Sequence, residues 1–360
     1  MKSLFTHFNK SCIPINVYFI NPLLDSRWDT LVACHPRASA FHQRGWLEAL
    51  KRTYGYEPLV LTSSAPGEPL HDGIVLCHIS SWLTGNRLVS LPFADHCDFL
   101  LSEQGNYSQL MAQLAAECDR LRCKYVELRP LMISPDLSGD LQPGSSYCFH
   151  ELDLTPSLDH LFRGLHKDSI QRKIRRAERE QLSCEQGRSN QLIDEFYQLL
   201  LMTRRRHQLP PQPRNWFANL LECMGDNIKI RLARKQNIPV AAIVTLRHGS
   251  SIVYKYGCSD EQFHHLGGMP FLFWRIIADS KASGAQTMDF GRSDMDNSGL
   301  IAFKDKFGAT KSTLTYYRYA KYLGREASSK WETSAIKQLF SILPDALLST
   351  AGRVLYRHMG

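Results

Sequence analysis

The sequence predicts an α/β protein of the α+β kind, in which helices flank mixed sheets. Short runs of alternating apolar and polar residues predict strands, and longer runs with helical periodicity lie between them. A helix followed by a strand with a central carboxylate recurs in both halves. The chain has 360 residues, which is enough for about two domains.

The first half is predicted to hold four strands and one helix. Apolar alternation predicts the strands at residues 58–62, 73–81, 87–91 and 124–129. Between the last two, Leu110, Met111, Leu114 and Cys118 share one face and predict a helix over residues 107–122.

The second half begins with a long predicted helix over residues 158–181. Its first turns carry Leu158, Leu161, Phe162 and Leu165 at helical spacing. The remaining helices are predicted at residues 191–207, 215–224 and 271–283, and the strands at residues 228–234, 240–247, 252–258 and 286–290. The last helix is preceded by paired glycines and by Pro270, which suits a first helical position.

Three parts are predicted along the chain. Residues 134–146 are rich in Ser, Gly, Asp and Pro, which predicts a linker. We therefore expect an N-terminal domain over residues 1–145, a C-terminal domain over 146–325 and an amphipathic helical tail over 326–360. The apolar residues of the tail alternate with cations. It is expected either to pack on the domains or to lie on a membrane surface.

The composition narrows the function classes. The formal net charge of +8 suits an anionic partner such as nucleic acid, a phosphorylated substrate or a membrane surface. Ten scattered cysteines form no CxxC pair, so we predict reduced thiols, a cytoplasmic location and no metal site. The sequence contains no apolar window of ~18 residues, and polar residues interrupt the apolar runs near the N-terminus, so neither a membrane-spanning helix nor a secretory signal is predicted.

The loop Leu266-Gly267-Gly268-Met269 before a predicted helix is one candidate binding feature. Backbone N–H groups at a helix start can hold a phosphate or a developing oxyanion. The alternative is a turn that only reverses the chain, because paired glycines commonly form turns.

A second candidate is the set of polar residues at and after the last predicted strand. Acyl transfer to an amine needs a group that deprotonates the amine and a positive charge near the leaving group. Asp289 or Asp294 fits the first role. Arg292, Lys304 or Lys306 fits the second. The alternative is a surface cluster of salt bridges.

Two further features point to binding. Arg172, Arg175 and Arg176 lie on the helix side opposite its apolar residues, and such a cationic face can bind the phosphates of tRNA, a nucleotide-linked precursor or lipid headgroups. The alternative is an ordinary solvated face. Asp95 and His96 follow a predicted strand and either line a substrate cleft or serve only the structure.

Ordered motifs in both halves carry a family resemblance. Those of the first half are Phe41-His42-Gln43-Arg44-Gly45-Trp46-Leu47 and Ser90-Leu91-Pro92-Phe93-Ala94-Asp95-His96-Cys97. Those of the second are Ile174-Arg175-Arg176-Ala177-Glu178-Arg179, the turn at 210–213, Tyr254-Lys255-Tyr256-Gly257-Cys258-Ser259, Asp289-Phe290-Gly291-Arg292-Ser293, Gly299-Leu300 and Phe303-Lys304-Asp305-Lys306-Phe307-Gly308. In this order they resemble the FemAB-like branch of the GNAT superfamily, including FemAB-related proteins found near exopolysaccharide and exosortase systems. The resemblance covers most of the chain.

The resemblance implies two fused GNAT folds, with tandem mixed sheets flanked by helices. Better-known members transfer an amino acid from aminoacyl-tRNA to an amine on a peptidoglycan precursor. The resemblance also implies that Lys304 lies beside the reacting groups and that residues 267–270 form a degenerate loop for the donor phosphates. The usual acyl-CoA loop has a leading Gln or Arg and a final small residue, both missing here, so the donor stays open.

These observations together predict an acyltransferase. It would transfer an N-acyl or aminoacyl group to an amine on a peptidoglycan or exopolysaccharide precursor, by direct attack of the amine. The donor would be aminoacyl-tRNA or acyl-CoA, with no tightly bound cofactor, in the cytoplasm or peripherally at the inner face of the membrane. The catalytic candidates are Lys304, Asp289, Arg292 and Asp294; the binding candidates are Gly267, Gly268, Ser293, Lys306, Arg172, Arg175, Arg176, Asp95 and His96. The alternatives are an acyl-CoA-dependent N-acetyltransferase and a non-catalytic module that binds tRNA or another anionic polymer.

Overall fold

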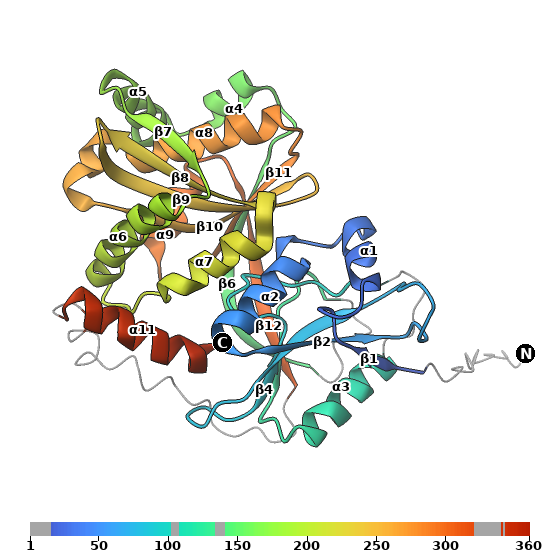
Figure 1. Cartoon of the computed structure of the whole chain (residues 1–360). Helices are drawn as coiled ribbons and strands as arrows, with labels where there is room; N and C mark the ends of the chain where they lie inside the picture. The colour runs from blue at the N-terminus through green and yellow to red at the C-terminus, as the bar shows by residue number, and fades with distance from the viewer. Residues whose placement is uncertain (1–15, 102–107, 134–140, 320–339, 341–342) are drawn as a thin grey trace, which may run out of the picture.

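The computed structural model describes residues 16–101, 108–133, 141–319, 340 and 343–360. Within these residues, twelve strands form one continuous mixed sheet (Figure 1). In their order across the sheet, the strands are β1 (Tyr18–Ile20), β2 (Glu57–Thr62), β3 (Ile74–Ile79), β4 (Arg87–Val89), β5 (Val126–Leu128), β12 (Thr310–Tyr319), β6 (Gln142–Asp153), β11 (Thr287–Asp294), β10 (Ser251–Ser259), β9 (Ile238–His248), β8 (Ile228–Lys235) and β7 (Ser183–Gly187). The α/β class is confirmed.

Helices cover both faces of the sheet (Figure 1). They are α1 (Arg27–Cys34), α2 (Arg44–Tyr54), α3 (Ser108–Arg120), α4 (Leu158–Gly164), α5 (Arg172–Arg179), α6 (Asn190–Arg206), α7 (Arg214–Met224), α8 (Gly268–Ala282), α9 (Ser298–Asp305) and α11 (Asp345–Met359). The short helical turns are η1 (Ala40–His42), η3 (Lys167–Gln171), η4 (Gly225–Asn227) and η5 (Glu261–Leu266). The helices predicted at residues 107–122, 191–207, 215–224 and 271–283 correspond to α3, α6, α7 and α8.

Strands β6 and β12 join the two halves at the centre of the sheet. β12 pairs antiparallel with β6 on one side and with β5 of the first half on the other. The tandem halves therefore share one sheet instead of forming two separate ones.

The halves also share a core. Trp46 of α2 lies 5.3 Å from Trp216 of α7, ring centroid to ring centroid. The two helices pack so closely that a Cβ on Gly45 would lie 2.4 Å from the backbone oxygen of Cys223. A second core lies on the other face of the second half, where Phe273 of α8 stacks on Phe290 of β11 at 5.2 Å. These two layers hold β10 and β11 between them.

Two predicted segments are corrected. Residues 142–146 of the predicted linker belong to β6, and residues 134–140 lie outside the described part. Their polar composition hid a strand that hydrogen-bonds to β11 and β12 on its two sides. The predicted helix over residues 158–181 is interrupted after Gly164 by the π-helical turn η3. There the side chain of Gln171 donates a hydrogen bond to the backbone oxygen of Leu165, and the chain continues as α5.

The helix α11 packs on both halves. Tyr56 and Arg87 of the first half hydrogen-bond to backbone oxygens at its C-terminal end. On the second half, a Cβ on Gly352 would lie only 1.9 Å from the backbone oxygen of Pro211, so helix and loop touch through their backbones. Among the described residues, no helix has the length and apolar character needed to cross a membrane.

Candidate functional site

A pocket of about 700 Å³ opens where β10 and β11 separate. The two parallel strands pair over only three residue pairs, which end at Val253 and Asp289. Beyond them, β10 bulges between Tyr254 and Tyr256, and β11 loses register with β6 between Asp289 and Arg292. The start of α8, the end of α6 and the helix α9 line the remaining sides. A gap between parallel strands leaves backbone groups without ladder partners, which a ligand can use.

Lys304 of α9 reaches this gap with a buried side chain. Its Nζ donates hydrogen bonds to the backbone oxygens of Gly291, at 2.9 Å, and Arg292, at 3.0 Å. An ammonium group has three donors, so one remains for a ligand in the pocket. Burial lowers the pKa of Lys304 to about 8. The aromatic contacts of Phe303 and Phe307 with Phe273 fix α9 in place.

Lys255 and Asp95 form an ion pair between the halves. Lys255 lies in the bulge of β10, and its Nζ donates to Oδ2 of Asp95 at 3.0 Å. The rings of Phe41 and Tyr256 surround the ammonium, with centroids 5.3 and 5.6 Å away. Burial lowers the pKa of Lys255. Burial alone would raise the pKa of Asp95, but the charges of Lys255 and Arg292 outweigh it and hold that pKa below its usual range.

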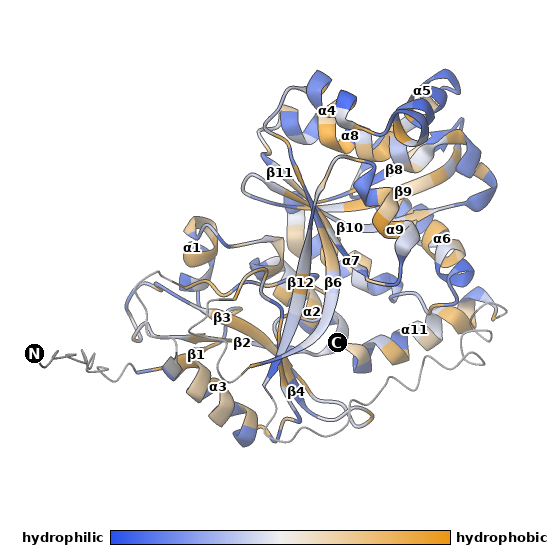
Figure 2. Cartoon of the chain, turned by 180° about the vertical axis from the view of Figure 1, so that it is seen from behind, coloured by the Kyte–Doolittle hydropathy of each residue, from blue (hydrophilic) through white to orange (hydrophobic). Residues whose placement is uncertain are grey.

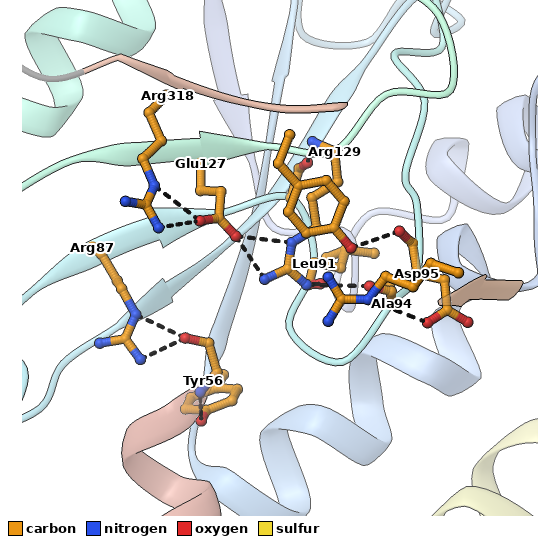
Figure 3. Close-up of polar contacts among 12 residues, drawn as sticks. Tyr56, Arg87, Leu91, Ala94, Asp95, Glu127, Arg129 and Arg318 are labelled. Carbon is orange, nitrogen blue, oxygen red and sulfur yellow. Dashed lines mark hydrogen bonds and ion pairs between the residues drawn. The ribbon is translucent and has the colours of Figure 1, made fainter. Parts of the chain in front are cut away.

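The loop that carries Asp95 is tightly held. Arg129 donates hydrogen bonds to the backbone oxygens of Leu91 and Ala94 and to the carboxylate of Glu127 (Figure 3). The Tyr316 hydroxyl donates to the backbone oxygen of Asp95 at 2.7 Å. Asp95 is therefore a fixed part of the pocket wall, contributed by the first half.

Arg292 lies on two tyrosine rings at the same wall. Its guanidinium carbon is 4.0 Å from the ring centroid of Tyr147 and 5.0 Å from that of Tyr316. Its Nε lies 4.0 Å from Oδ1 of Asp95. The Nη1 atom is buried and has no hydrogen-bond partner among the described residues. The rest of the side chain is partly exposed, at 32%, and Arg292 lines the pocket, so a substrate oxygen can bind its guanidinium.

Asp289 and His96 lie behind the wall. Nε2 of His96 is 2.8 Å from Oδ2 of Asp289, whose Oδ1 accepts from the backbone N–H of Gly291 at 2.5 Å. Burial lowers the pKa of His96, but the hydrogen bond and the charge of Asp289 outweigh it, and the net pKa is raised. Both side chains are buried and neither lines the pocket. Asp289 and Lys304 both hydrogen-bond to the backbone of Gly291, so these two predicted residues lie close together.

The paired glycines start α8 beside the pocket. Gly267 has a φ of +78°, and a Cβ there would lie 2.6 Å from the backbone oxygen of Lys173. A Cβ on Gly268 would lie 3.1 Å from that of Ala241, which is tight. The backbone conformation and the close packing at position 267 therefore require glycine, whether or not a ligand binds there. Both residues also line the pocket, where the N–H groups of the first helical turn favour an anion.

The pocket is strongly cationic. Among the described residues that line it, Asp95 is the one acid, and six side chains are cationic: Lys173, Arg204, Arg206, Lys255, Arg292 and Lys304. Lys173 lies against Gly267 at the start of α8, Arg204 and Arg206 come from the end of α6, and Lys255 and Arg292 lie beside Asp95. This distribution suits a ligand with anionic groups at more than one point.

Other predicted site residues lie outside the pocket. Arg172, Arg175 and Arg176 are exposed on the outer side of α5, a helix that is mostly hydrophilic (Figure 2). Asp294 is exposed at the end of β11.

Two more predicted residues do not line the pocket either. The Ser293 side chain is buried, and its Oγ has no partner among the described residues. Lys306 is half-buried and accepts a backbone hydrogen bond from His166.

Sequence reasoning missed several lining residues. Lys255 belongs to the motif at residues 254–259 but is not among the predicted site residues, although a lone lysine in an apolar strand is an unusual signal. Arg204 and Arg206 lie at the C-terminal end of α6. Basic residues are common there because they interact favourably with the helix dipole, so these two arginines did not point to a binding site. Among the described residues, no group of three or more His, Cys, Asp or Glu side chains is arranged to hold a metal ion.

Comparison with known proteins agrees with this geometry. Residues 165–304 match the family described as an acetyltransferase (GNAT) domain. This segment contains the gap between β10 and β11, the start of α8 and Lys304. No curated protein sequence matches the chain.

Solved structures extend the similarity to both halves. FemX superposes with a TM-score of 0.66 at 14% identity, covering 82% of this chain and 95% of FemX. The C-terminal domain of an assigned lysylphosphatidylglycerol synthetase from Agrobacterium fabrum gives 0.54 at 14% identity, covering 82% and 91%. A tandem GNAT protein from the clavulanic acid biosynthesis pathway gives 0.52 at 11% identity, covering 85% and 98%. Residues 165–304 thus match a GNAT acetyltransferase domain, and the chain as a whole has the fold of FemX and of these tandem GNAT structures.

Proposed function

We propose that this chain transfers an acyl group from an activated ester or thioester to an amine, in the pocket between β10 and β11. The observation that carries the proposal is Lys304, a buried cation where the two strands separate, with one N–H that has no partner in the described part of the chain. The GNAT acyltransferase fold gives the reaction class.

The amine attacks the acyl carbon directly. The new C–N bond forms as the C–O or C–S bond to the carrier breaks, and the amine proton leaves to water or to the carrier. Negative charge develops on the carbonyl oxygen and the leaving atom. The third N–H of Lys304, which has no partner among the described residues, stabilises that charge, and a fixed donor of this kind is usually the largest single contribution to catalysis.

The donor brings phosphate groups to the start of α8. Lys173 lies against Gly267 at this turn, and Arg204 and Arg206 line the same pocket from the end of α6. A CoA ester and an aminoacyl-tRNA both supply such groups. The exposed arginines of α5 lie on the same helix as Lys173 and continue the positive surface outward from it. This continuity favours aminoacyl-tRNA as the donor.

The acceptor is an amine on a molecule that also carries an anionic group. Arg292 lines the pocket with a side chain that is 32% exposed, and phosphate or carboxylate oxygens bind a guanidinium well. An amine-bearing precursor of peptidoglycan or exopolysaccharide fits this chemistry. The ion pair of Lys255 and Asp95 bounds the same space.

Product formation tests the proposal. The purified chain is incubated with acyl-CoAs or charged tRNAs together with envelope precursors, and new amides are sought by mass spectrometry. We expect an amide from one donor class, and none from Lys304→Met with the same donor. No amide with any donor, combined with strongly salt-dependent RNA binding, would assign the chain to the non-catalytic alternative.

A further inference from the structure

An exposed apolar ridge runs along α11 and continues onto the turn between β3 and β4. Its members are Leu347 and Val354 of the helix and Trp82 of the turn, and we name these three residues the α11 ridge. Their side chains are strongly exposed, at 55%, 53% and 85% respectively. Hydrophilic and hydrophobic residues alternate along this helix (Figure 2). A tryptophan side chain this exposed to water is uncommon on a protein surface that has no binding partner.

The ridge is continuous because of helical geometry. At about 100° per residue, Leu347 and Val354 differ in direction by roughly 20°, and His358 lies about 40° from Val354. The ring of His358 contacts that of Trp82 edge-on, with 5.4 Å between centroids. Trp82 therefore extends the line beyond the last turn of the helix. Leu348 and Leu355 point to another side of α11 and are buried against the protein.

Cations flank the ridge. Arg353 and Arg357 are exposed on α11, and Lys124 is held at the turn because its Nζ donates to the backbone oxygen of Thr84 at 2.8 Å. None of the three forms an ion pair with a described acidic side chain. An apolar line beside unpaired cations is complementary to a surface with negative charge over an apolar interior.

We propose that the α11 ridge docks on an anionic lipid surface. The indole of Trp82 and the side chains of Val354 and Leu347 enter the headgroup boundary, where tryptophan is favoured. Arg353, Arg357 and Lys124 meet the lipid phosphates. A second copy of this chain is a poorer occupant, because a symmetric contact would bring the same cations against each other. The proposal depends on this surface alone and not on the proposed reaction.

Cosedimentation with vesicles tests the proposal on the full chain. We expect binding to vesicles of phosphatidylcholine with phosphatidylglycerol, weaker binding as salt rises, and little binding to phosphatidylcholine alone. Trp82→Ala is expected to weaken the partition about tenfold, and the double variant Arg353→Gln, Arg357→Gln should flatten the salt dependence.

Leu24→Ala is the matched control. Leu24 is 84% exposed but lies in the turn before α1, away from the ridge, so its variant should bind as the parent does. Circular dichroism of the Trp82 variant should match the parent, since this side chain is mostly in solvent. Equal binding of both variants, or equal binding to both vesicle types, would overturn the proposal. So would a dimer in sedimentation velocity that Trp82→Ala dissociates.

Discussion

Lys255 of β10 donates a hydrogen bond at 3.0 Å to Asp95, a residue of the first half, and so fixes one wall of the pocket across the two halves. Neither half has this wall without the other. The backbone of Gly291 lies against the Asp95 carboxylate, because a Cβ there would be 2.9 Å from Oδ2. The first half thus contributes to a pocket that otherwise belongs to the matched GNAT domain.

Breaking this ion pair should destabilise the chain. Asp95→Asn removes the counter-charge of Lys255, whose side chain is only 6% exposed. A buried charge left without its partner typically costs about 3 kcal/mol or more. Urea unfolding should show this loss for Asp95→Asn. Asp294→Asn is the control, because that carboxylate is exposed and should change the free energy of unfolding by less than about 0.5 kcal/mol.

A double variant separates pairing from packing. If the pair behaves as a unit, Asp95→Asn combined with Lys255→Met should lose clearly less than the sum of the single losses, since no charge is then stranded. Additive losses within about 0.3 kcal/mol would show that the two residues act independently.

The charge of Lys304 should set an alkaline limit to activity. Its pKa is lowered to about 8, so the ammonium is present below that pH and is lost above it. If the charge stabilises the transition state, kcat/KM for the transfer reaction should fall as pH rises through about 8. Lys304→Met should lower kcat roughly 10²–10³-fold and lack this limb. A parent profile that stays level up to pH 10 would contradict the role.

The local sequence pattern predicted those helices and strands whose apolar residues repeat at regular spacing within the element itself. Strands β2 to β5 and β8 to β11 each bury an apolar run and were predicted close to their observed bounds. β6 was missed because Ser, Gly and Pro dominate its first residues. What makes that segment a strand is its pairing with β11 and β12, which come more than 130 residues later in the chain.

The candidate site was predicted in part for the same reason. Lys304 and Arg292 belong to two neighbouring motifs, and the structure brings both to the pocket. Lys255 was missed because its significance depends on Asp95, which is 160 residues away. Asp294 lies only two residues after Arg292 but is exposed at the end of β11, and the local sequence does not determine which side chains there face the pocket.

Arg292 should determine how well the acceptor binds. Arg292→Gln removes the charge and the stacking on Tyr147, so KM for an anionic acceptor should rise about tenfold, with a smaller change in kcat. Arg292→Lys keeps the charge but not the planar fork and should recover only part of the loss. Arg214→Gln is the control, since it breaks an exposed ion pair with Asp194 outside the pocket. An unchanged KM in Arg292→Gln would remove this residue from acceptor binding.

Glycine at position 352 should be essential for the docking of α11. In an open helix, Gly→Ala stabilises by about 1 kcal/mol. Here a Cβ would lie 1.9 Å from the backbone oxygen of Pro211, so helix and loop must move apart. Gly352→Ala should therefore lower the free energy of unfolding, by about 1–3 kcal/mol. Gly164→Ala, where a Cβ meets nothing within 4 Å, should be neutral or slightly stabilising in the same urea titration. Because α11 contacts both halves, the Gly352 variant should also be cleaved more readily by protease within α11. Equal protease resistance of the Gly352 and Gly164 variants would show that the close contact is relieved while α11 stays docked.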